Sequence, residues 1–297
     1  MGVVRGRVIA MSKAEAPRRG VVRSSLALAI ATTLAIWSPH TTNAGDVAWP
    51  NQVSARYRLQ FNGFEVGFYD FTSRFSGNTY SATGKTRISA LFGAFKWTGS
   101  FSGSGSLDGN APHPANYQMN SKAKSKINSV TIGFDATGVA SVALVPNKPP
   151  HTDAVPLRPD NLKHVFDPMA ATLAISSTSA PEACNRTIPV FDGKARFDLK
   201  LSLKGREAIK DKQPTGQPAE LIVCRVKYIP IAGHKPNDFV HPWIDYDHIE
   251  IALRAIPSAG IYVPYRVKVP STIGPAVMDA QSINITAANN TQIALRQ

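Results

Sequence analysis

The stretch VSARYRLQFNGFEVGFYDFTSRF, residues 53–75, decides the fold. Apolar and polar residues alternate over 53–61, which is the period of a β-strand that buries one face. Asn62-Gly63 follows, and this pair favours a two-residue hairpin turn because both residues accept a positive φ. The alternation resumes after the turn and changes phase near Gly67, which indicates a β-bulge. The stretch therefore predicts a β-hairpin.

The same pattern returns along the rest of the chain. Further strands are expected at 79–88, 95–107, 115–125, 127–134, 138–145, 187–191, 194–204, 219–231, 248–256, 262–269 and 282–286. The glycines that alternate through FKWTGSFSGSGSL are typical of a strongly bent sheet. No βαβ rhythm and no repeat of 20 to 50 residues is present. We therefore expect a mainly β fold, a highly curved antiparallel sheet that forms an open or closed barrel.

One short helix is predicted near residues 167–177. Asp167 is a preferred N-cap, Pro168 suits the first helical position, and MAATLAIS supplies helix formers. A helix of this length can cover one mouth or face of a sheet. The preceding loop, 146–165, contains five prolines. We expect a single β-rich domain over 45–297, with this loop as the alternative position of a domain boundary.

Residues 1–44 have the pattern of a secretory signal peptide. Six basic side chains precede the apolar run SLALAIATTLAIW, and Thr42-Asn43-Ala44 offers a cleavage site with small residues. The run has 13 residues, whereas a helix needs about 20 to cross a bilayer. An uncleaved amphipathic anchor is the alternative, and either Met1 or Met11 suits as the start. The pattern predicts an exported bacterial envelope protein that resides in the periplasm.

The charge indicates which partners to expect. The whole chain has a net charge of +13, and 45–297 retain 27 basic and 19 acidic residues, a net charge of +8. The basic residues are scattered, without an arginine-rich run between aromatic residues, so we expect no nucleic-acid partner. An anionic envelope surface is the partner that such a charge favours.

Cys184 and Cys224 are the only cysteines. Two cysteines in an exported chain favour one disulfide between them. A nucleophilic cysteine would need a lowered pKa and a nearby histidine, and CNRTIPVFDGKARFDLKL, residues 184–201, contains no histidine. Free or metal-binding thiols are the alternative.

Motifs for catalysis or metal binding are weak. FVHPWIDYDHIEI gathers His241, Asp245, Asp247 and His248, which are possible zinc ligands, but the spacing matches no known zinc motif and favours solvated residues at a strand entry. The glycines around Ser104 lie within a predicted strand rather than before a helix, unlike the nucleophile turn of serine hydrolases. We therefore predict no catalytic residue, no metal and no cofactor. A cell-wall or polysaccharide hydrolase is the alternative, because its paired carboxylates can lie far apart in the sequence.

The first strands are rich in aromatic residues. Large apolar residues mostly form a core, which is the simplest interpretation. The functional interpretation is a cavity for an apolar ligand, covered by the predicted helix. The cavity wall is then expected to include Tyr57, Phe61, Phe68, Trp97, Phe101, Met169 and Leu173.

Five segments resemble a known family. They are YRLQFNGFEVG, DPMAATLA, CNRTIPVFDGKARFDL, CRVKYIPIAGHKP and IYVPYRVKVPSTIG. Together they resemble domain of unknown function 3108, a family of bacterial exported proteins, over most of residues 50–275. The resemblance implies a β-rich fold and residence in the envelope. The family has no established activity, so no catalytic residue carries over. A likeness in architecture alone connects the expected fold with half-barrel carriers of lipoproteins and lipids.

We therefore expect a periplasmic β-protein that binds an apolar or amphipathic, lipid-like ligand in envelope maintenance. The alternatives are a structural or interaction protein of the envelope without a ligand, and the hydrolase.

Overall fold

The computed structural model describes residues 49–90, 93–177, 183–209, 218–235 and 244–296. Contacts divide the chain into two units, residues 1–43 and 44–297, and all described residues belong to the second. The predicted signal peptide lies outside the described residues. Within the described residues, no helix has the length and apolar character needed to cross a membrane.

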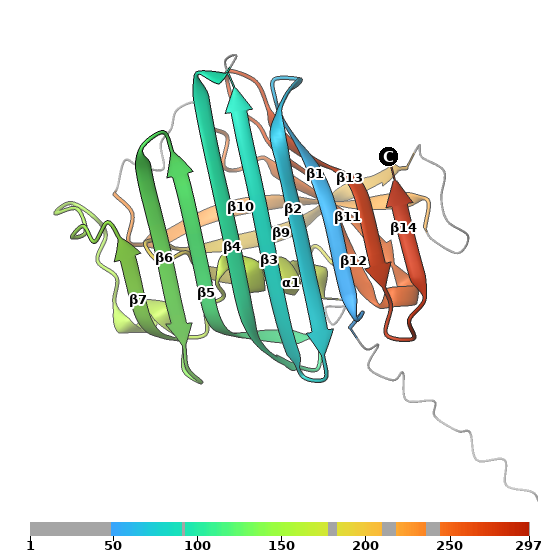
Figure 1. The fold of residues 1–297 in the computed structure, drawn as a ribbon, viewed down its shortest axis with the longest axis horizontal. Coiled ribbons are helices and arrows are strands. Elements are labelled where there is room, and N and C mark those ends of the chain that lie inside the picture. Colours follow the sequence, from blue (N-terminus) through green and yellow to red (C-terminus); the bar gives the residue numbers. More distant parts are fainter. Residues whose placement is uncertain (1–48, 91–92, 178–182, 210–217, 236–243, 297) are drawn as a thin grey trace, which may run out of the picture. The chain divides into compact units, whose positions relative to one another are not determined.

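The described residues form one antiparallel sheet of 14 strands. The strands are β1 (Gln52–Phe61), β2 (Phe64–Ser76), β3 (Thr79–Ala90), β4 (Phe95–Asp108), β5 (Ala111–Ala123), β6 (Lys126–Phe134), β7 (Val139–Val145), β8 (Arg186–Phe191), β9 (Arg196–Ala208), β10 (Glu220–Ala232), β11 (Ile249–Ile256), β12 (Ile261–Val269), β13 (Ala276–Thr286) and β14 (Gln292–Arg296). Their order is β7-β6-β5-β4-β3-β2-β1-β13-β12-β11-β10-β9-β8, and β14 pairs with β13 (Figure 1). We call β1–β7 the first arm and β8–β14 the second arm.

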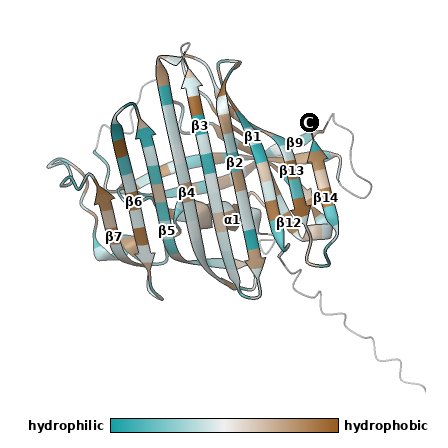
Figure 2. Ribbon diagram, viewed as in Figure 1, coloured by the Kyte–Doolittle hydropathy of each residue, from teal (hydrophilic) through white to brown (hydrophobic). Residues whose placement is uncertain are grey.

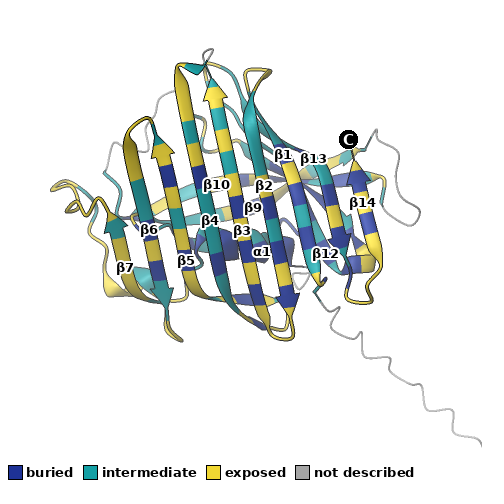
Figure 3. Ribbon diagram, in the orientation of Figure 1, coloured by how far each residue is buried: buried dark blue, intermediate teal, exposed yellow. Residues whose placement is uncertain are grey.

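Alternation along the strands produces two unlike faces. In β3, Tyr80, Ala82 and Gly84 are buried while the residues between them are exposed, and Figure 3 shows this banding. One face of an antiparallel sheet commonly packs on the core while the other meets water. We call these the inner and the outer face. β4 is pale along most of its length in Figure 2, because its many serines and glycines have hydropathies near zero.

The β1–β2 hairpin has the predicted turn. Asn62 and Gly63 both have positive φ, 48° and 83°. The register between the strands shifts at Leu59/Gln60, opposite Gly67, so the predicted bulge is present. Gly67 has a φ of 156°, and a Cβ there would lie 1.9 Å from the carbonyl oxygen of Arg87. This close backbone approach excludes a side chain at position 67.

The single α-helix among the described residues is α1 (Pro168–Ser176). Two short 3₁₀ helices lie elsewhere in the chain, η2 (Pro159–Leu162) and η3 (Pro257–Ala259). Asp167 is the N-cap, and its Oδ1 accepts hydrogen bonds from the backbone N–H groups of Met169 (2.7 Å) and Ala170 (3.1 Å). The predicted helix, its N-cap and the position of Pro168 are confirmed.

The sheet does not close, and the predicted barrel is wrong. β7 and β8 end the strand order and do not pair with each other, and the sheet is not strongly curled. The physical reason is the position of the helix, which contacts β4 and β5 of the first arm and β8 and β12 of the second. Figure 1 shows α1 behind the first-arm strands. A helix that packs against both arms occupies the space that a closed barrel would fill with side chains of its own strands.

The segment before α1 covers the free edge of β8. Phe166 makes a parallel bridge with Val190, its N–H donates to Pro189, and Phe191 donates back to Phe166. Lys163 pairs with Gly138, beside β7. Edge strands need such protection because their unpaired backbone groups invite association. Residues 163–166 therefore make hydrogen bonds with the edge of the sheet that a neighbouring strand would make in a closed barrel.

Cys184 and Cys224 form a disulfide, with their Cα atoms 5.2 Å apart. The pairing predicted from the cysteine count is therefore present. Both residues are buried within an apolar cluster that also contains Ile188, Leu201 and Leu253. The bond attaches the segment that follows α1 to β10, in the second arm.

Candidate ligand-binding cavity

A cavity of about 250 Å³ lies between α1 and the inner face of the sheet. Its wall residues come from β1 and β2 of the first arm, from α1, and from β9 to β13 of the second arm. The contributing segments of β1 and of β11–β13 lie far apart in the sequence and become neighbours because β1 pairs with β13. The cavity is therefore a product of the long-range sheet topology.

The wall is apolar. The first arm contributes Val53, Ala55, Tyr57, Tyr69, Phe71 and Phe75, and the second contributes mainly Ile, Val and Met side chains such as Ile261, Val263, Met278 and Ile283. None of the described residues that line the cavity is charged, and its few hydroxyl groups include those of Ser73, Thr172 and Ser176. Such a wall favours an uncharged or apolar group as the occupant.

Two tyrosines shape one side of the cavity. The rings of Tyr57 and Tyr69 stack with centroids 6.0 Å apart, and Tyr69 meets Phe101 edge to face. The Tyr57 hydroxyl donates a 3.0 Å hydrogen bond to the carbonyl oxygen of Pro264. Burial raises the pKa of Tyr57 well above its usual value and that of Tyr69 to about 12, so both hydroxyls are neutral. Neither hydroxyl is an anion, and that of Tyr57 can only accept a further hydrogen bond because its proton is donated to Pro264.

The helix that forms the cavity's remaining wall is held at both ends. Its sequence has no polar stripe, since both arms of the sheet bury it. At its N-terminus Asp167 is fully buried, and burial raises the pKa of its carboxyl group to about 6. At its C-terminus the guanidinium of Arg186 donates to the carbonyl oxygens of Ala174 and, at 3.0 Å, Ser177. These bonds satisfy carbonyl groups that the last turn leaves without partners.

A second apolar space adjoins the cavity. This groove, of about 390 Å³, lies at the strand ends near the β1–β2 turn and is lined by residues of β1–β4, β12 and β13. Val267 and Met278 line both the groove and the cavity. Phe61 and Phe95 line the groove and are partly exposed. The groove therefore offers an apolar approach to the cavity from this end of the sheet.

The seven side chains predicted as cavity wall occupy four environments. Tyr57 and Leu173 line the cavity, and Phe61 lines the groove. Trp97, Phe101 and Met169 lie on the inner side without lining the cavity; Met169 packs over Gly103. Phe68 lies on the outer face, where the guanidinium of Arg56 sits 4.7 Å from its ring centroid. A role of these residues in ligand binding stays a prediction.

Most of the wall that the sequence did not single out comes from the second arm. Residues 262–269 and 282–286 were expected as strands because they alternate in the same way as the first hairpin, whereas 276–281, the start of β13, were not. Nothing local indicated that the inner faces of these strands meet Tyr57 and Leu173. Tyr69 and Phe71 follow the bulge, and their position on the inner face depends on that shift of register.

The histidine and aspartate residues near 245 form surface contacts. His248 Nδ1 lies 2.7 Å from Asp245 Oδ2, and Lys227 pairs with Asp247 at 3.0 Å. The hydrogen bond from His248 holds the pKa of Asp245 below its usual range. His241 lies outside the described residues. In the described part of the chain, no group of three His, Cys, Asp or Glu side chains is arranged to hold a metal ion.

Comparison with known proteins identifies the family. The comparisons with curated proteins and with solved structures each found no match. The family model described as "Protein of unknown function (DUF3108)" matches residues 56–281, which span β1 to β13 and include both cysteines and α1. This range is well over half of the chain, and the chain therefore belongs to the DUF3108 family.

Proposed function

We propose that this protein binds an apolar or amphipathic, lipid-like ligand, with the apolar part in the cavity between α1 and the sheet. The observation that carries the proposal is the cavity of about 250 Å³, whose described wall residues come from both arms and the helix and include no charged residue. Ligand sites of small molecules commonly measure about 300–1,000 Å³ and are mostly apolar. The cavity is slightly smaller than this range and suits a compact apolar group or part of an acyl chain, and the adjoining groove extends the space for a longer molecule.

In this proposal α1 is the cover of the site. Thr172, Leu173, Ile175 and Ser176 face the ligand from the helix, while Tyr57 and Tyr69 face it from the first arm. The hydroxyl groups of Tyr69 and Ser73 offer the few hydrogen bonds that would orient a polar head or carbonyl group, since Tyr57 donates its proton to Pro264. Binding here needs no catalytic group, since the wall supplies contact area and the hydrophobic effect supplies the affinity.

The setting that we propose is the bacterial periplasm. The disulfide is consistent with an oxidising compartment outside the cytoplasm, where such bonds persist. The N-terminal pattern of residues 1–44 supports export. A periplasmic carrier or sensor of lipid-like molecules would act in envelope maintenance.

The first test is extraction of the purified protein with organic solvent and mass spectrometry of the extract, together with titration of a fluorescent fatty acid. We expect a co-purifying apolar molecule and saturable binding of the probe. Leu173→Trp should weaken probe binding about tenfold or more, because the larger ring occupies cavity space and overpacking costs about 1–3 kcal/mol.

Leu295→Trp is the matched control. Leu173 and Leu295 are both 2% exposed, but Leu295 lies on β14 and does not line the cavity. Both changes should lower thermal stability to a similar degree, and only Leu173→Trp should weaken binding. An empty extract with no saturable binding would contradict the proposed function and favour a structural envelope protein. Equal binding by the two variants would contradict this location of the site.

A further inference from the structure

The protein has an apolar rim at one end of its strands. Five of the nine large apolar side chains that are exposed within the described residues lie there. They are Phe61 (38% exposed), Phe64 (74%), Phe95 (44%), Ile127 (61%) and Ile273 (62%). These residues end β1, begin β2, β4 and β6, or lie between β12 and β13, and the antiparallel pairings bring these positions to the same end of the sheet. Exposed apolar side chains gathered at one place mark interaction sites.

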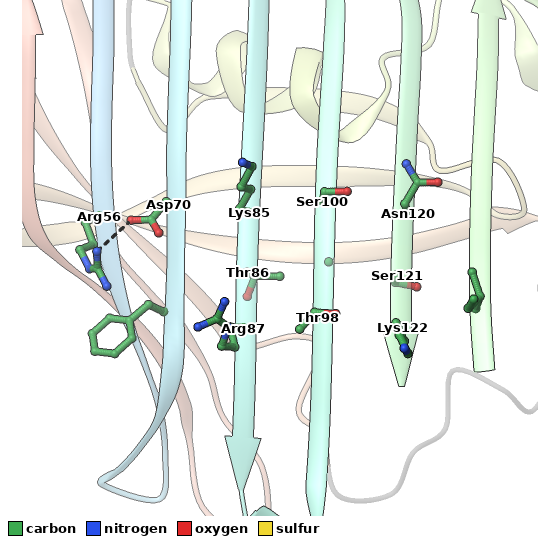
Figure 4. Close-up of a pocket in the computed structure, with 13 residues that line it drawn as sticks. Arg56, Asp70, Lys85, Thr86, Arg87, Thr98, Ser100, Asn120, Ser121 and Lys122 are labelled. Carbon is green, nitrogen blue, oxygen red and sulfur yellow. Dashed lines mark ion pairs between the residues drawn. The ribbon is translucent and has the colours of Figure 1, made fainter. Parts of the chain in front are cut away.

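A basic cluster on the outer face continues from this rim. Lys85, Arg87 and Lys122 are exposed and line a shallow depression of about 530 Å³. Figure 4 shows Lys85 and Arg87 on β3 between the Arg56–Asp70 pair and Lys122 on β5. Within the described residues, no acidic side chain lies within ion-pair distance of these three cations, whereas Arg56 and Asp70 pair at 3.6 Å.

The strand register fixes how the basic cluster meets the rim. Lys122 is directly opposite Ile127 of the rim, and Arg87 lies in the same cross-strand row through Thr98. Residues directly opposite on neighbouring strands share one face of the sheet. Lys96, Lys124 and Lys126 are exposed beside the rim, as is Glu65, and exposed Asp245 lies against Pro270, three residues before Ile273. Cationic and apolar side chains therefore form one continuous border.

We propose that this end of the protein docks on the surface of an anionic lipid bilayer. The phenylalanine and isoleucine side chains of the rim enter the boundary between headgroups and acyl chains. The basic cluster and the lysines beside the rim then lie against the phosphate groups. Interfacial binding of this kind combines buried apolar area with electrostatic attraction to anionic lipids.

A bilayer can interact with both the apolar rim and the basic cluster, whereas a soluble anionic polymer can interact with only the basic cluster. A charged polysaccharide satisfies the cations but offers little to Phe64, the most exposed of the rim residues at 74%. The apolar groove also opens at this end, with Phe61 and Phe95 in its wall. Docking would thus bring the groove to the acyl region of the membrane. The inference goes beyond the proposed function, because docking does not require an occupied cavity.

The test is co-sedimentation of the full chain with vesicles of equimolar phosphatidylglycerol and phosphatidylcholine, and with vesicles of phosphatidylcholine alone. Binding should be tighter to the anionic vesicles and should weaken with added salt. Phe64→Ser should weaken it about tenfold, as expected for the loss of one inserted aromatic side chain. The combined change Lys85→Gln, Arg87→Gln and Lys122→Gln should weaken it by at least about tenfold, and only on anionic vesicles.

Matched controls separate the rim and the cluster from general effects of charge and hydrophobicity. Leu203→Ser removes an apolar side chain that is 60% exposed in the middle of β9, and should leave binding unchanged. The combined change Lys194→Gln, Lys200→Gln and Arg225→Gln removes three exposed positive charges outside the basic cluster, and it should leave the preference for anionic vesicles nearly unchanged. All variants carry the same N-terminus, so its contribution is equal in each comparison. Far-UV circular dichroism and the thermal midpoint establish that each variant is folded.

A second measurement covers the case of a variant that does not fold. Phe64→Trp places a larger aromatic side chain at an exposed turn position, and its added fluorescence should shift to shorter wavelength on anionic vesicles. Equal vesicle binding by all variants, or a Phe64→Trp spectrum that vesicles leave unchanged, would overturn the proposal. A third result would also overturn it: the basic-cluster variant loses binding to a soluble anionic polysaccharide, while Phe64→Ser binds vesicles as tightly as wild type. Failure here with intact fatty-acid binding would leave the proposed function standing.

Discussion

Replacing both cysteines, Cys184→Ala with Cys224→Ala, is expected to lower the free energy of unfolding by about 4 kcal/mol. The disulfide closes a loop of 40 residues, and the cross-link removes conformational freedom mainly from the unfolded chain. Alanine is the appropriate replacement because both sites are buried, at 1% and 0% exposure, and a serine hydroxyl would need a partner there. The loss is a large part of the 5–15 kcal/mol typical of a native protein.

Denaturant unfolding followed by circular dichroism measures the effect. The midpoint should fall strongly for the double alanine variant, and the wild-type protein unfolded in the presence of a thiol reductant should give a curve close to that of the variant. Without denaturant, reduction should be slow, because solvent does not reach either sulfur in the folded state. A loss below about 1 kcal/mol would show that the disulfide leaves the unfolded ensemble almost unconstrained, against the chain-entropy account.

Asp167→Asn is expected to make the protein more stable than wild type at pH 8, by up to about 3 kcal/mol. The wild-type carboxylate is fully buried, and burial raises its pKa from 3.8 to about 6. Asparagine keeps an oxygen that can accept from the N–H groups of Met169 and Ala170, and it carries no charge; its amide nitrogen replaces Oδ2, which is buried without a hydrogen-bond partner, so the gain stays below the full value. Asp167→Ala, by contrast, loses this cap and should be destabilised by about 1–2 kcal/mol relative to Asp167→Asn.

The sign of the pH dependence follows from the raised pKa. Between about pH 4 and pH 6 the folded state holds a proton on Asp167 that the unfolded state has released. The contribution of this residue to stability is therefore greatest below pH 4, falls as the pH rises through 6, and is constant above that. Free energies of unfolding measured from pH 4 to pH 8 should show this fall in wild type and lose it in Asp167→Asn.

Asp135 is the matched control for this prediction. Its Oδ1 accepts from the N–H groups of Thr137 at 2.7 Å and Gly138 at 3.1 Å, which are the distances found at Asp167, but the residue is exposed. A hydrogen bond from the Thr137 hydroxyl, together with these backbone bonds, lowers the pKa of Asp135, so its contribution is lost as the pH falls, opposite to that of Asp167. If Asp167→Asn is less stable than wild type at pH 8 and keeps the same pH slope, burial does not penalise the carboxylate.

Local features of the fold were predictable because their causes are local. The turn at Asn62-Gly63 needs residues that accept positive φ, and both have it. The helix begins where Asp167 caps it and Pro168 enters it, and it ends at Ser176 within one residue of the expected end. β14 was missed because it is a five-residue strand at the end of the chain, after a turn at which Asn290 has a φ of 65°.

The barrel prediction failed because closure is a long-range property. Alternation in each strand is the same whether the outermost strands pair or stay apart. The order here joins β1 to β13 and leaves β7 and β8 as ends. The segment 146–165 was expected as a loop, but its end and α1 together account for the open sheet. Residues 163–166 cover the edge of β8, and the helix lies between the arms.

The candidate site shows the same division. Tyr57 and Leu173 were predictable from the sequence as large apolar or aromatic side chains. That both line one cavity depends on the helix, which packs against both arms. Phe68 was expected beside them, yet it follows the bulge at Gly67 and lies with Arg56 on the outer face. A shift of one residue moves a side chain to the opposite face, so a bulge decides which aromatics line the cavity.

By itself, the sequence determined a mainly β chain with one capped helix, one disulfide and an excess of positive charge. Periodicity, capping, turn conformation and cysteine count act over a few residues or through composition, so they can be read without the fold. Only the tertiary structure decided that the sheet stays open, that α1 separates its arms around an apolar cavity, and that the basic cluster meets the apolar rim. These outcomes depend on which distant strands pair, and that choice is a balance of packing and chain entropy over the whole domain.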